Sequence, residues 1–505
     1  MLQCVNGKTL LHFSIISLEI FTHSLIQNSL IAYSFPEIAS GFRFTQHSKF
    51  IHSKLIMVAT IDPITSIKQK NKDHTFFSWS VQSQVNPVVI ESAKGVYLNS
   101  KSGKKYIDFS SQLMNVNIGH GRLEVTEAVT RQMQKFSFVA PSFATDVRGE
   151  LGEKLAEITP GNLSKTFFTL GGAEAIENAI KLARLYSGKD KIITNYRSYH
   201  GATMAAISAG GDPRKLMVDR NQVPNIVHVQ NPYSYRCPWY SDSPEECGER
   251  AAKNMEDVIL FEGPQNIAAI LMEGESGTSG CIKYPPMYWK KIKDLADKYN
   301  ILTISDEVMS GFCRTGKWFG VDNHSVTPDI MCMAKGLTSG YIPLGVMIVT
   351  DEIAQAMDDQ YLPLGLTYSA HTVACASALA VIDIYEKENL ANRAVKMGAY
   401  IDKRMEDLKA KHPSIGDWRN TGMLGAIEIV KSRETKEPMA RWNAKASEMG
   451  AMLDVKKKLA ELGMFTFVKW NYIFVASPLT ITESEVEEGL DILSQAISLA
   501  DKQSL

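Results

Sequence analysis

The sequence of 505 residues predicts an α/β fold with a mostly parallel central sheet, helices on both faces and a smaller α+β domain. Three observations support this prediction. Short β-branched runs alternate with amphipathic helical segments in the middle of the chain, and glycine or polar turns follow the strands. After about residue 379, long charged helices replace that alternation. A chain of this length can form two or more domains with large cores.

The first elements belong to a small meander. From 88 to 109, short apolar runs alternate with glycine and asparagine turns, a pattern typical of short antiparallel strands. Helical spacing then covers 123–133 and 147–158, and the second helix ends before Pro160 and Gly161. These helices lead into the alternating part of the chain.

Strands and helices alternate in the next part of the sequence. We expect strands at 166–169, 191–195, 267–272, 301–305 and 330–333, and helices at 174–186 and 287–299. This order favours parallel strands whose carboxyl ends meet at one edge of the sheet, where open α/β sheets bind their ligands.

Domain boundaries follow from the change of pattern. We expect a large domain over 111–379 and a smaller α+β domain built from 57–110 and 380–505. The second part of the smaller domain combines charged helices with short strands. The helices are expected at 389–411 and 444–462, and the strands at 425–430 and 472–475.

The first 56 residues differ from the rest of the chain. They contain only two acidic residues, Glu19 and Glu37, and their apolar residues are interrupted too often for a membrane-spanning helix. Two interpretations stay open, an organelle transit segment or a start assigned ahead of Met57. The first predicts a mitochondrial protein and the second a cytoplasmic one. In both cases residues 1–56 form an extension outside the fold.

Composition argues against several classes of function. The 54 lysines and arginines nearly balance the 55 acidic residues, so net charge favours neither nucleic acid nor a membrane surface as a partner. Seven cysteines without a CxxC pair argue against a zinc site or a disulfide framework and favour a reducing compartment. Cys237 and Cys247, expected in one loop, leave a cross-link or a metal site open. We otherwise expect no metal.

Two motifs offer parts of a cofactor site. Gly172 and Ala173 lie in a glycine turn that follows a strand and opens a helix, whose N-terminal N–H groups can bind a phosphate. Tyr199 follows the strand at 191–195 and can stack on a flat heterocycle. Taken alone, such a glycine turn is more often an ordinary β–α turn, and such a tyrosine a surface aromatic.

Asp306 and Lys335 carry the sharper signal. Asp306 ends a buried strand, where an unpaired carboxylate is costly and a protonated ring nitrogen would pair with it. Lys335 ends the next strand, where burial lowers a lysine pKa and frees its lone pair for an aldehyde. Val308 would point to the same face as Asp306 and pack on the ring. A glycine turn, an aromatic residue, an aspartate and a lysine in this order indicate pyridoxal 5′-phosphate (PLP) chemistry.

From about residue 78 to 497 the chain resembles the class III (ω-type) aminotransferases, which have the PLP fold type I. The matching segments are GGAEAIENAIKLAR (171–184), YHGAT (199–203), SDEVMSGFCRTGKWFG (305–320), PDIMCMAKGLTSGYIPLG (328–345) and LTYSAHTVACASALA (366–380). The aspartate-to-lysine segment is highly specific to this family, whereas the glycine turn is less so.

The resemblance implies a role for each matching residue. The implied PLP contacts are Gly172 and Ala173 at the phosphate, Tyr199 and Val308 on the ring, Asp306 at the ring nitrogen and Lys335 as the Schiff-base lysine. Ala173 replaces a serine that many members carry, which removes one side-chain hydrogen bond. Thr367 matches a threonine that reaches the phosphate of the neighbouring subunit, which implies an obligate homodimer with shared active sites.

Departures from the family pattern bear on the substrate. Members that use 4-aminobutyrate or ornithine derivatives commonly have arginine directly after His-Gly, where this chain has Ala202. Lys469 lies where many members carry a mobile carboxylate-binding arginine, although lysine lacks the bidentate fork. Arg419 is a second candidate for that role, with a structural role as its alternative. Met114 replaces an aromatic residue of the pocket and would make the donor side wider or softer.

The resemblance implies a ping-pong transamination from a primary amine or ω-amino acid to a small 2-oxo acid, with pyruvate favoured. Lys335 would transfer the proton between substrate and cofactor carbons, and Asp306 would keep the ring protonated. The alternatives are a 4-aminobutyrate transaminase, an aminomutase or decarboxylase on the same scaffold, and a non-catalytic binding protein. The presence of both Asp306 and Lys335 argues against the last.

Overall fold

The computed structural model describes residues 62–504, which divide into two units at Ser78 and Trp79. The interpretation of residues 1–56 lies outside the described residues. In the first unit, helix α3 (Pro63–His74) begins after Asp62, whose carboxylate accepts a hydrogen bond from the Thr65 N–H. All other elements belong to the second unit.

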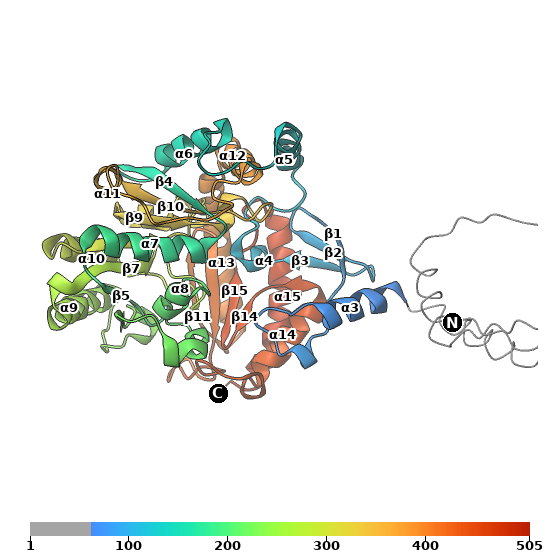
Figure 1. The fold of residues 1–505 in the computed structure, drawn as a ribbon. Coiled ribbons are helices and arrows are strands. Elements are labelled where there is room, and N and C mark those ends of the chain that lie inside the picture. The colour runs from blue at the N-terminus through green and yellow to red at the C-terminus, as the bar shows by residue number, and fades with distance from the viewer. Residues whose placement is uncertain (1–61, 505) are drawn as a thin grey trace, which may run out of the picture. The chain divides into compact units, whose positions relative to one another are not determined.

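A seven-stranded sheet positions most of the chemistry-bearing residues of the second unit (Figure 1). Its order is β4 (Leu163–Thr169), β10 (Gly345–Thr350), β9 (Ile330–Met333), β8 (Leu302–Asp306), β7 (Ile267–Glu273), β5 (Lys191–Asn195) and β6 (Ile226–Val229). The strands from β9 to β6 run parallel, whereas β10 is antiparallel to both β9 and β4. The predicted mostly parallel sheet is confirmed, and β6 and β10 are additions to the strands expected.

Helices cover both faces of this sheet because its side chains alternate in direction. Ile192 and Leu271 point to the face covered by α7 and α8, whereas Ile193 and Ile270 pack on the opposite side with α9 and α10. The bounds of these helices are α7 (Gly172–Ser187), α8 (Met204–Ala209), α9 (Pro244–Glu262) and α10 (Tyr288–Lys298). Burial on both faces explains why the strands are continuous apolar runs.

Two four-stranded sheets lie outside the central sheet. The first contains β1 (Ile90–Lys94), β2 (Tyr97–Ser100), β3 (Lys105–Asp108) and β13 (Met464–Phe465). The second contains β11 (Ile415–Thr421), β12 (Leu424–Ile429), β15 (Tyr472–Val475) and β14 (Val468–Lys469). The meander expected from 88 to 109 is confirmed, and β13 adds a parallel strand from the C-terminal part of the chain.

The remaining helices are α4 (Ser111–Met114), α5 (Leu123–Lys135), α6 (Asp146–Ile158), α11 (Asp351–Ala356), α12 (Thr372–Lys387), α13 (Leu390–Lys411), α14 (Ala451–Leu462) and α15 (Glu483–Asp501). Helix α14 corrects the helix expected over 444–462. It begins only at Ala451 because Gly450 has φ +51° and ψ −130°, a conformation that a continuous helix cannot contain. The segment before it contains only the short 3₁₀ turn Ala446–Glu448.

Three further observations concern the expected classes of site. Within residues 62–504, no helix has the length and apolar character needed to cross a lipid bilayer. The same residues contain no group of three or more histidine, cysteine, aspartate or glutamate side chains that could hold a metal ion. Cys237 and Cys247 are free thiols and do not share one loop, because Cys247 lies buried in the first turn of α9.

A buried guanidinium links distant segments of the second unit. Arg314 donates hydrogen bonds to the carbonyl oxygen of Ser477 and to Oδ1 of Asn117, both at 2.6 Å. It also donates to Ser111 Oγ and to the carbonyl oxygens of Met423 and Ala476. Burial lowers the pKa of Arg314 to about 10, which still leaves the group protonated at neutral pH. One cation therefore binds polar groups from three parts of the chain.

We expect Arg314→Leu to lower the free energy of unfolding by about 3–5 kcal/mol, because it leaves buried acceptors without a donor. Urea unfolding followed by circular dichroism measures the change. Arg131→Leu is the matched control, since that side chain is 69% exposed and pairs with Glu127 only at 3.8 Å. A loss below 1 kcal/mol for Arg314→Leu would show that the network adds little to stability.

Candidate active site

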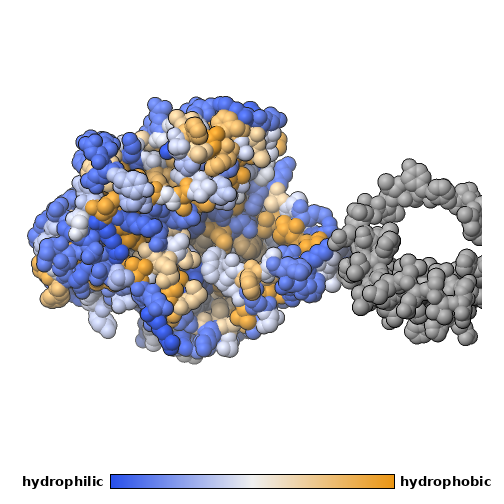
Figure 2. All heavy atoms as spheres, viewed as in Figure 1, coloured by the Kyte–Doolittle hydropathy of each residue, from blue (hydrophilic) through white to orange (hydrophobic). Residues whose placement is uncertain are grey.

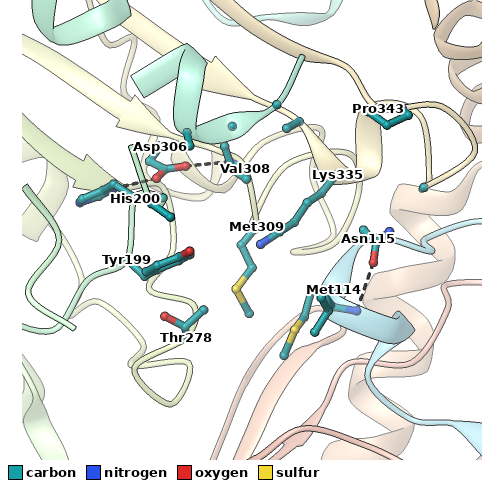
Figure 3. Close-up of a pocket in the computed structure, with 18 of the residues that line it drawn as sticks. Met114, Asn115, Tyr199, His200, Thr278, Asp306, Val308, Met309, Lys335 and Pro343 are labelled. Carbon is teal, nitrogen blue, oxygen red and sulfur yellow. Dashed lines mark hydrogen bonds and ion pairs between the residues drawn. The ribbon is translucent and has the colours of Figure 1, made fainter. Parts of the chain in front are cut away.

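A cavity of about 510 Å³ lies at the carboxyl ends of the central strands (Figure 3). Its walls bring together most of the residues singled out in the sequence, which follow β4, β5, β8 and β9. These residues are Gly172, Ala173, Tyr199, Ala202, Asp306, Val308 and Lys335, together with Met114. Parallel strands place their ends at one edge, so residues far apart in sequence meet there.

Asp306 is buried at the end of β8, with both carboxylate oxygens engaged. Oδ2 lies 2.7 Å from Nδ1 of His200, and Oδ1 accepts a hydrogen bond of 2.9 Å from the Val308 N–H. His200 is itself buried, and its Nε2 lies 3.4 Å from Thr194 Oγ1. These contacts fix the direction of the carboxylate. The sequence signal for His200 was its place beside Tyr199, which did not reveal Asp306 as its partner.

Lys335 reaches the same cavity from the end of β9. Figure 3 shows its side chain pointing into the cavity, toward the side where Asp306 and Tyr199 lie. Burial lowers the pKa of Lys335, and the charges of Asp306 and Glu273 oppose that shift. Among the residues that the structure describes, no hydrogen bond or ion pair holds Nζ of Lys335. A lysine with a lowered pKa and an uncommitted amine is suited to attack an aldehyde.

The N-terminus of α7 forms another wall of the cavity. A Cβ on Gly172 would come within 2.7 Å of a Val308 methyl group, and one on Gly201 within 2.4 Å of Ala173 Cβ. The missing side chains let three backbone segments approach one another closely. The free N–H groups of the first helical turn then provide a cradle for an anion. Together with an oriented carboxylate, an aromatic ring and an amine, this cradle fits PLP.

The wall around Tyr199 contains charged residues that sequence analysis missed. The guanidinium of Arg214 lies 3.7 Å from the centre of the Tyr199 ring, and its Nε donates to Asp212 Oδ1 at 2.7 Å. Asp212 is buried and also pairs with Lys469. The local signal available was Asp212 before Pro213, which is typical of a helix start. It indicated a 3₁₀ turn (η2, Pro213–Asn221) but no link to the cavity.

Glu273 is a second buried acid at the edge of the sheet, at the end of β7. Its carboxylate accepts hydrogen bonds from the backbone N–H groups of Tyr199 at 2.9 Å and Gly277 at 2.7 Å. Burial raises the pKa of Glu273, and His200 acts against that shift. Its place at a strand end is the same signal that identified Asp306. The contacts show that Glu273 fixes the backbone on which Tyr199 stands.

Three candidates from the sequence do not line the cavity. Arg419 pairs with Asp417 at 2.6 Å and Glu428 at 2.9 Å, which corresponds to the structural alternative for this residue. Lys469 is held by Asp212. Thr367 is exposed shortly before α12, so a role at a phosphate would require a second subunit.

Comparison with known proteins identifies one family. The model of the family described as aminotransferase class-III matches residues 79–497. A putrescine–pyruvate aminotransferase of Pseudomonas aeruginosa is 35% identical over 446 residues, covering 85% of this chain and 94% of that protein. Gamma aminobutyrate transaminase 2 of Solanum lycopersicum is 31% identical over 442 residues, with 84% and 94% covered.

Solved structures agree with the sequence comparison. The taurine:2-oxoglutarate aminotransferase of Bifidobacterium kashiwanohense, in complex with PLP and glutamate, has a TM-score of 0.85 and 34% identity. The similarity covers 88% of this chain and all of that one. An (S)-enantioselective omega-transaminase from Thermomicrobium roseum has a TM-score of 0.82 and 35% identity, with 87% and 99% covered.

We expect Gly201→Ala to weaken PLP binding at least about fivefold. The φ of Gly201 is +131°, and the added methyl group would overlap Ala173, which costs about 1–3 kcal/mol. Titration of the apoprotein with PLP, followed by visible absorbance, measures the dissociation constant. Gly210→Ala is the matched control, because its φ is −63° and the new Cβ would meet neighbours only at 3.5 Å. Equal affinities for the two variants would contradict the role of this close approach.

Proposed function

The chain belongs to the class III aminotransferases, which use PLP, and from this premise we propose a specific transamination. The donor is a primary amine or an ω-amino acid, and the acceptor is a small 2-oxo acid, with pyruvate preferred. The observation that carries the proposal is that Lys335 and the oriented carboxylate of Asp306 share one cavity. When bound, PLP supplies an aldehyde for the amino group and a ring that withdraws electrons from the substrate carbon.

Different residues of the cavity have different roles in such an amino-group transfer. Asp306 would pair with the ring nitrogen of PLP and favour its protonated form, and His200 fixes the direction of the carboxylate. Lys335 would hold the aldehyde through Nζ, and once an amine has displaced it, Nζ would move a proton from the substrate carbon to the cofactor carbon. The N-terminus of α7 would hold the phosphate of PLP. Burial lowers the pKa of Lys335, which supports its use as a base.

The lining of the cavity supports an unbranched donor with a terminal amine. Leu113, Met114, Met309 and Phe467 form apolar walls that suit a methylene chain. Ala202 stands where other family members commonly have an arginine, so the side chain at this position cannot bind a second carboxylate of a substrate. Putrescine, taurine and 4-aminobutyrate, named for similar proteins, are all unbranched terminal amines. Pyruvate is favoured over 2-oxoglutarate because the second carboxylate of 2-oxoglutarate would meet these apolar walls.

We also propose that the protein is a homodimer in which each subunit completes the site of its partner. Phe143 and Tyr368 are 63% and 52% exposed in the segments that lead into α6 and α12. Figure 2 shows apolar surface at the top of this view, where these helices lie. Exposed aromatic side chains are typical of interfaces between subunits. The exposed position of Thr367, outside its own cavity, supports the same arrangement.

A panel of donors and acceptors tests the reaction. We expect alanine to form from pyruvate with putrescine, β-alanine, taurine or 4-aminobutyrate, at a kcat/KM at least tenfold above that for 2-oxoglutarate. Glyoxylate completes the panel, and the amino acids are measured by chromatography. Lys335→Ala is the inactive control. Preference for 2-oxoglutarate would refute the acceptor assignment. Product formed without consumption of an oxo acid would point to an aminomutase or a decarboxylase.

A complementation experiment tests the shared site. We expect Lys335→Ala and Thr367→Glu each to be inactive, the second because an added carboxylate repels the phosphate of PLP. Refolding the two variants together should give mixed dimers with about half the activity of a native dimer, since one of the two sites in a mixed dimer has both native residues. Each variant refolded alone is the control. A mixture that stays inactive although mixed dimers form would contradict the sharing of sites.

A further inference from the structure

Arg214 lines the cavity with a guanidinium whose two terminal nitrogens are available to a ligand. It lies on η2, after the segment that carries Tyr199, and its side chain is 28% exposed. Its guanidinium carbon lies 3.7 Å from the centre of the Tyr199 ring and 5.3 Å from the centre of the Trp79 ring. Nε is bound to Asp212. Within residues 62–504, neither terminal nitrogen of Arg214 has a hydrogen-bond partner, so both remain available to a ligand.

The support beneath Arg214 is a buried charge network. Asp212 is only 4% exposed in its side chain and binds Arg214 with one oxygen and Lys469 with the other. Burial opposes ionisation of Asp212, but the hydrogen bond and charge of Arg214 and the charge of Lys469 outweigh it and hold its pKa below the ordinary value. Two cations on one anion leave the trio with a net charge of about +1. That excess charge reaches the cavity through Arg214, because Lys469 does not line it.

The other charged groups of the cavity lining are already committed. Glu273 accepts two backbone hydrogen bonds, Asp306 is bound by His200, and Lys335 carries the amine required for the transfer. Ala202 supplies no charge, and Arg419 lies outside the cavity. Among the described residues, Arg214 is thus the one guanidinium in the cavity lining.

We propose that Arg214 binds the carboxylate of the 2-oxo acid acceptor, an inference that rests on the proposed transaminase function. The two terminal nitrogens of a guanidinium match the two oxygens of a carboxylate in a bidentate pair. The bond to Asp212 and the stacking on Tyr199 hold the group before the substrate arrives, which reduces the entropy lost on binding. Arg214 does not take part in proton transfer. It determines which carbonyl compounds are accepted as substrates.

This role separates two kinds of acceptor. Pyruvate and acetaldehyde present a methyl-bearing carbonyl, but only pyruvate carries a carboxylate for Arg214. A residue that binds the carboxylate should therefore raise kcat/KM for pyruvate. It should leave kcat/KM for acetaldehyde unchanged. A residue that only maintains the shape of the cavity would affect both acceptors alike. The ratio of the two kcat/KM values is the quantity that distinguishes these roles.

The test compares Arg214→Gln, Arg214→Lys and the neighbouring control Lys215→Gln, all with PLP bound and the same amine donor. We expect Arg214→Gln to lower the pyruvate-to-acetaldehyde ratio at least tenfold, mainly through the KM for pyruvate. Arg214→Lys should restore part of the ratio, because a single charge remains without the fork. Lys215→Gln should leave it unchanged, since Lys215 does not line the cavity. An unchanged ratio in Arg214→Gln, or equal losses for both acceptors, would overturn the assignment.

A binding measurement gives an independent readout. Propionate has the carboxylate but no carbonyl, so calorimetry can measure its dissociation constant without turnover. We expect this constant to rise at least tenfold in Arg214→Gln and to stay within twofold of the native value in Lys215→Gln. Native protein that transaminates no oxo acid would refute the proposed function. Native protein that transaminates pyruvate while Arg214→Gln binds propionate as before would refute only the role of Arg214.

Discussion

The carboxylate of Asp306 is the group on which the candidate site depends, because burying a negative charge is costly unless its oxygens are bound. His200 and the Val308 N–H bind both oxygens and fix the carboxylate at the end of β8. That position exists only because β8 is held between β7 and β9, both parallel to it. The same parallel register places Lys335 and Glu273 at the same edge. The sheet thus supplies both the shape of the site and the arrangement of its charges.

Close backbone packing gives this arrangement its rigidity. Gly172 and Gly201 leave no room for a side chain of their own, because Val308 packs against the first and Ala173 against the second. Interiors packed in this way do not deform gradually, so a small added group shifts whole segments. The polar wall of the cavity is therefore fixed largely by the backbone, because backbone N–H groups donate hydrogen bonds to the carboxylates of Asp306 and Glu273. Methionine, leucine and phenylalanine side chains also line the cavity, and the flexible methionines can adapt to ligands of different shape.

Sequence reasoning succeeded where a signal is local. The strand at 191–195 has the expected bounds, and Asp306 and Lys335 follow their strands as expected, because apolar runs and the residues that end them are neighbours in sequence. It missed pairs that only the fold creates. The His200 contact with Asp306 spans 106 positions, and that of Asp212 with Lys469 spans 257. The expected start of α14 was wrong because charged helical spacing continues through Gly450, whose backbone conformation ends any helix. Strand β10 runs antiparallel because the chain returns from β9 to the neighbouring position without a crossover, which periodicity does not encode.

The pairing of β3 with β13 has a consequence for the order of folding. The N-terminal meander cannot gain its fourth strand until Met464 and Phe465 have been synthesised, after most of the chain has left the ribosome. Until then β3 has an unpaired edge, which can pair with other chains. The hydrogen bonds from Lys104 Nζ to the carbonyl oxygens of Ala460 and Glu461 also form only after this segment has been synthesised. A chain released from the ribosome before β13 is synthesised would therefore expose the edge of β3, which is prone to aggregation. In the complete chain, β13 covers this edge.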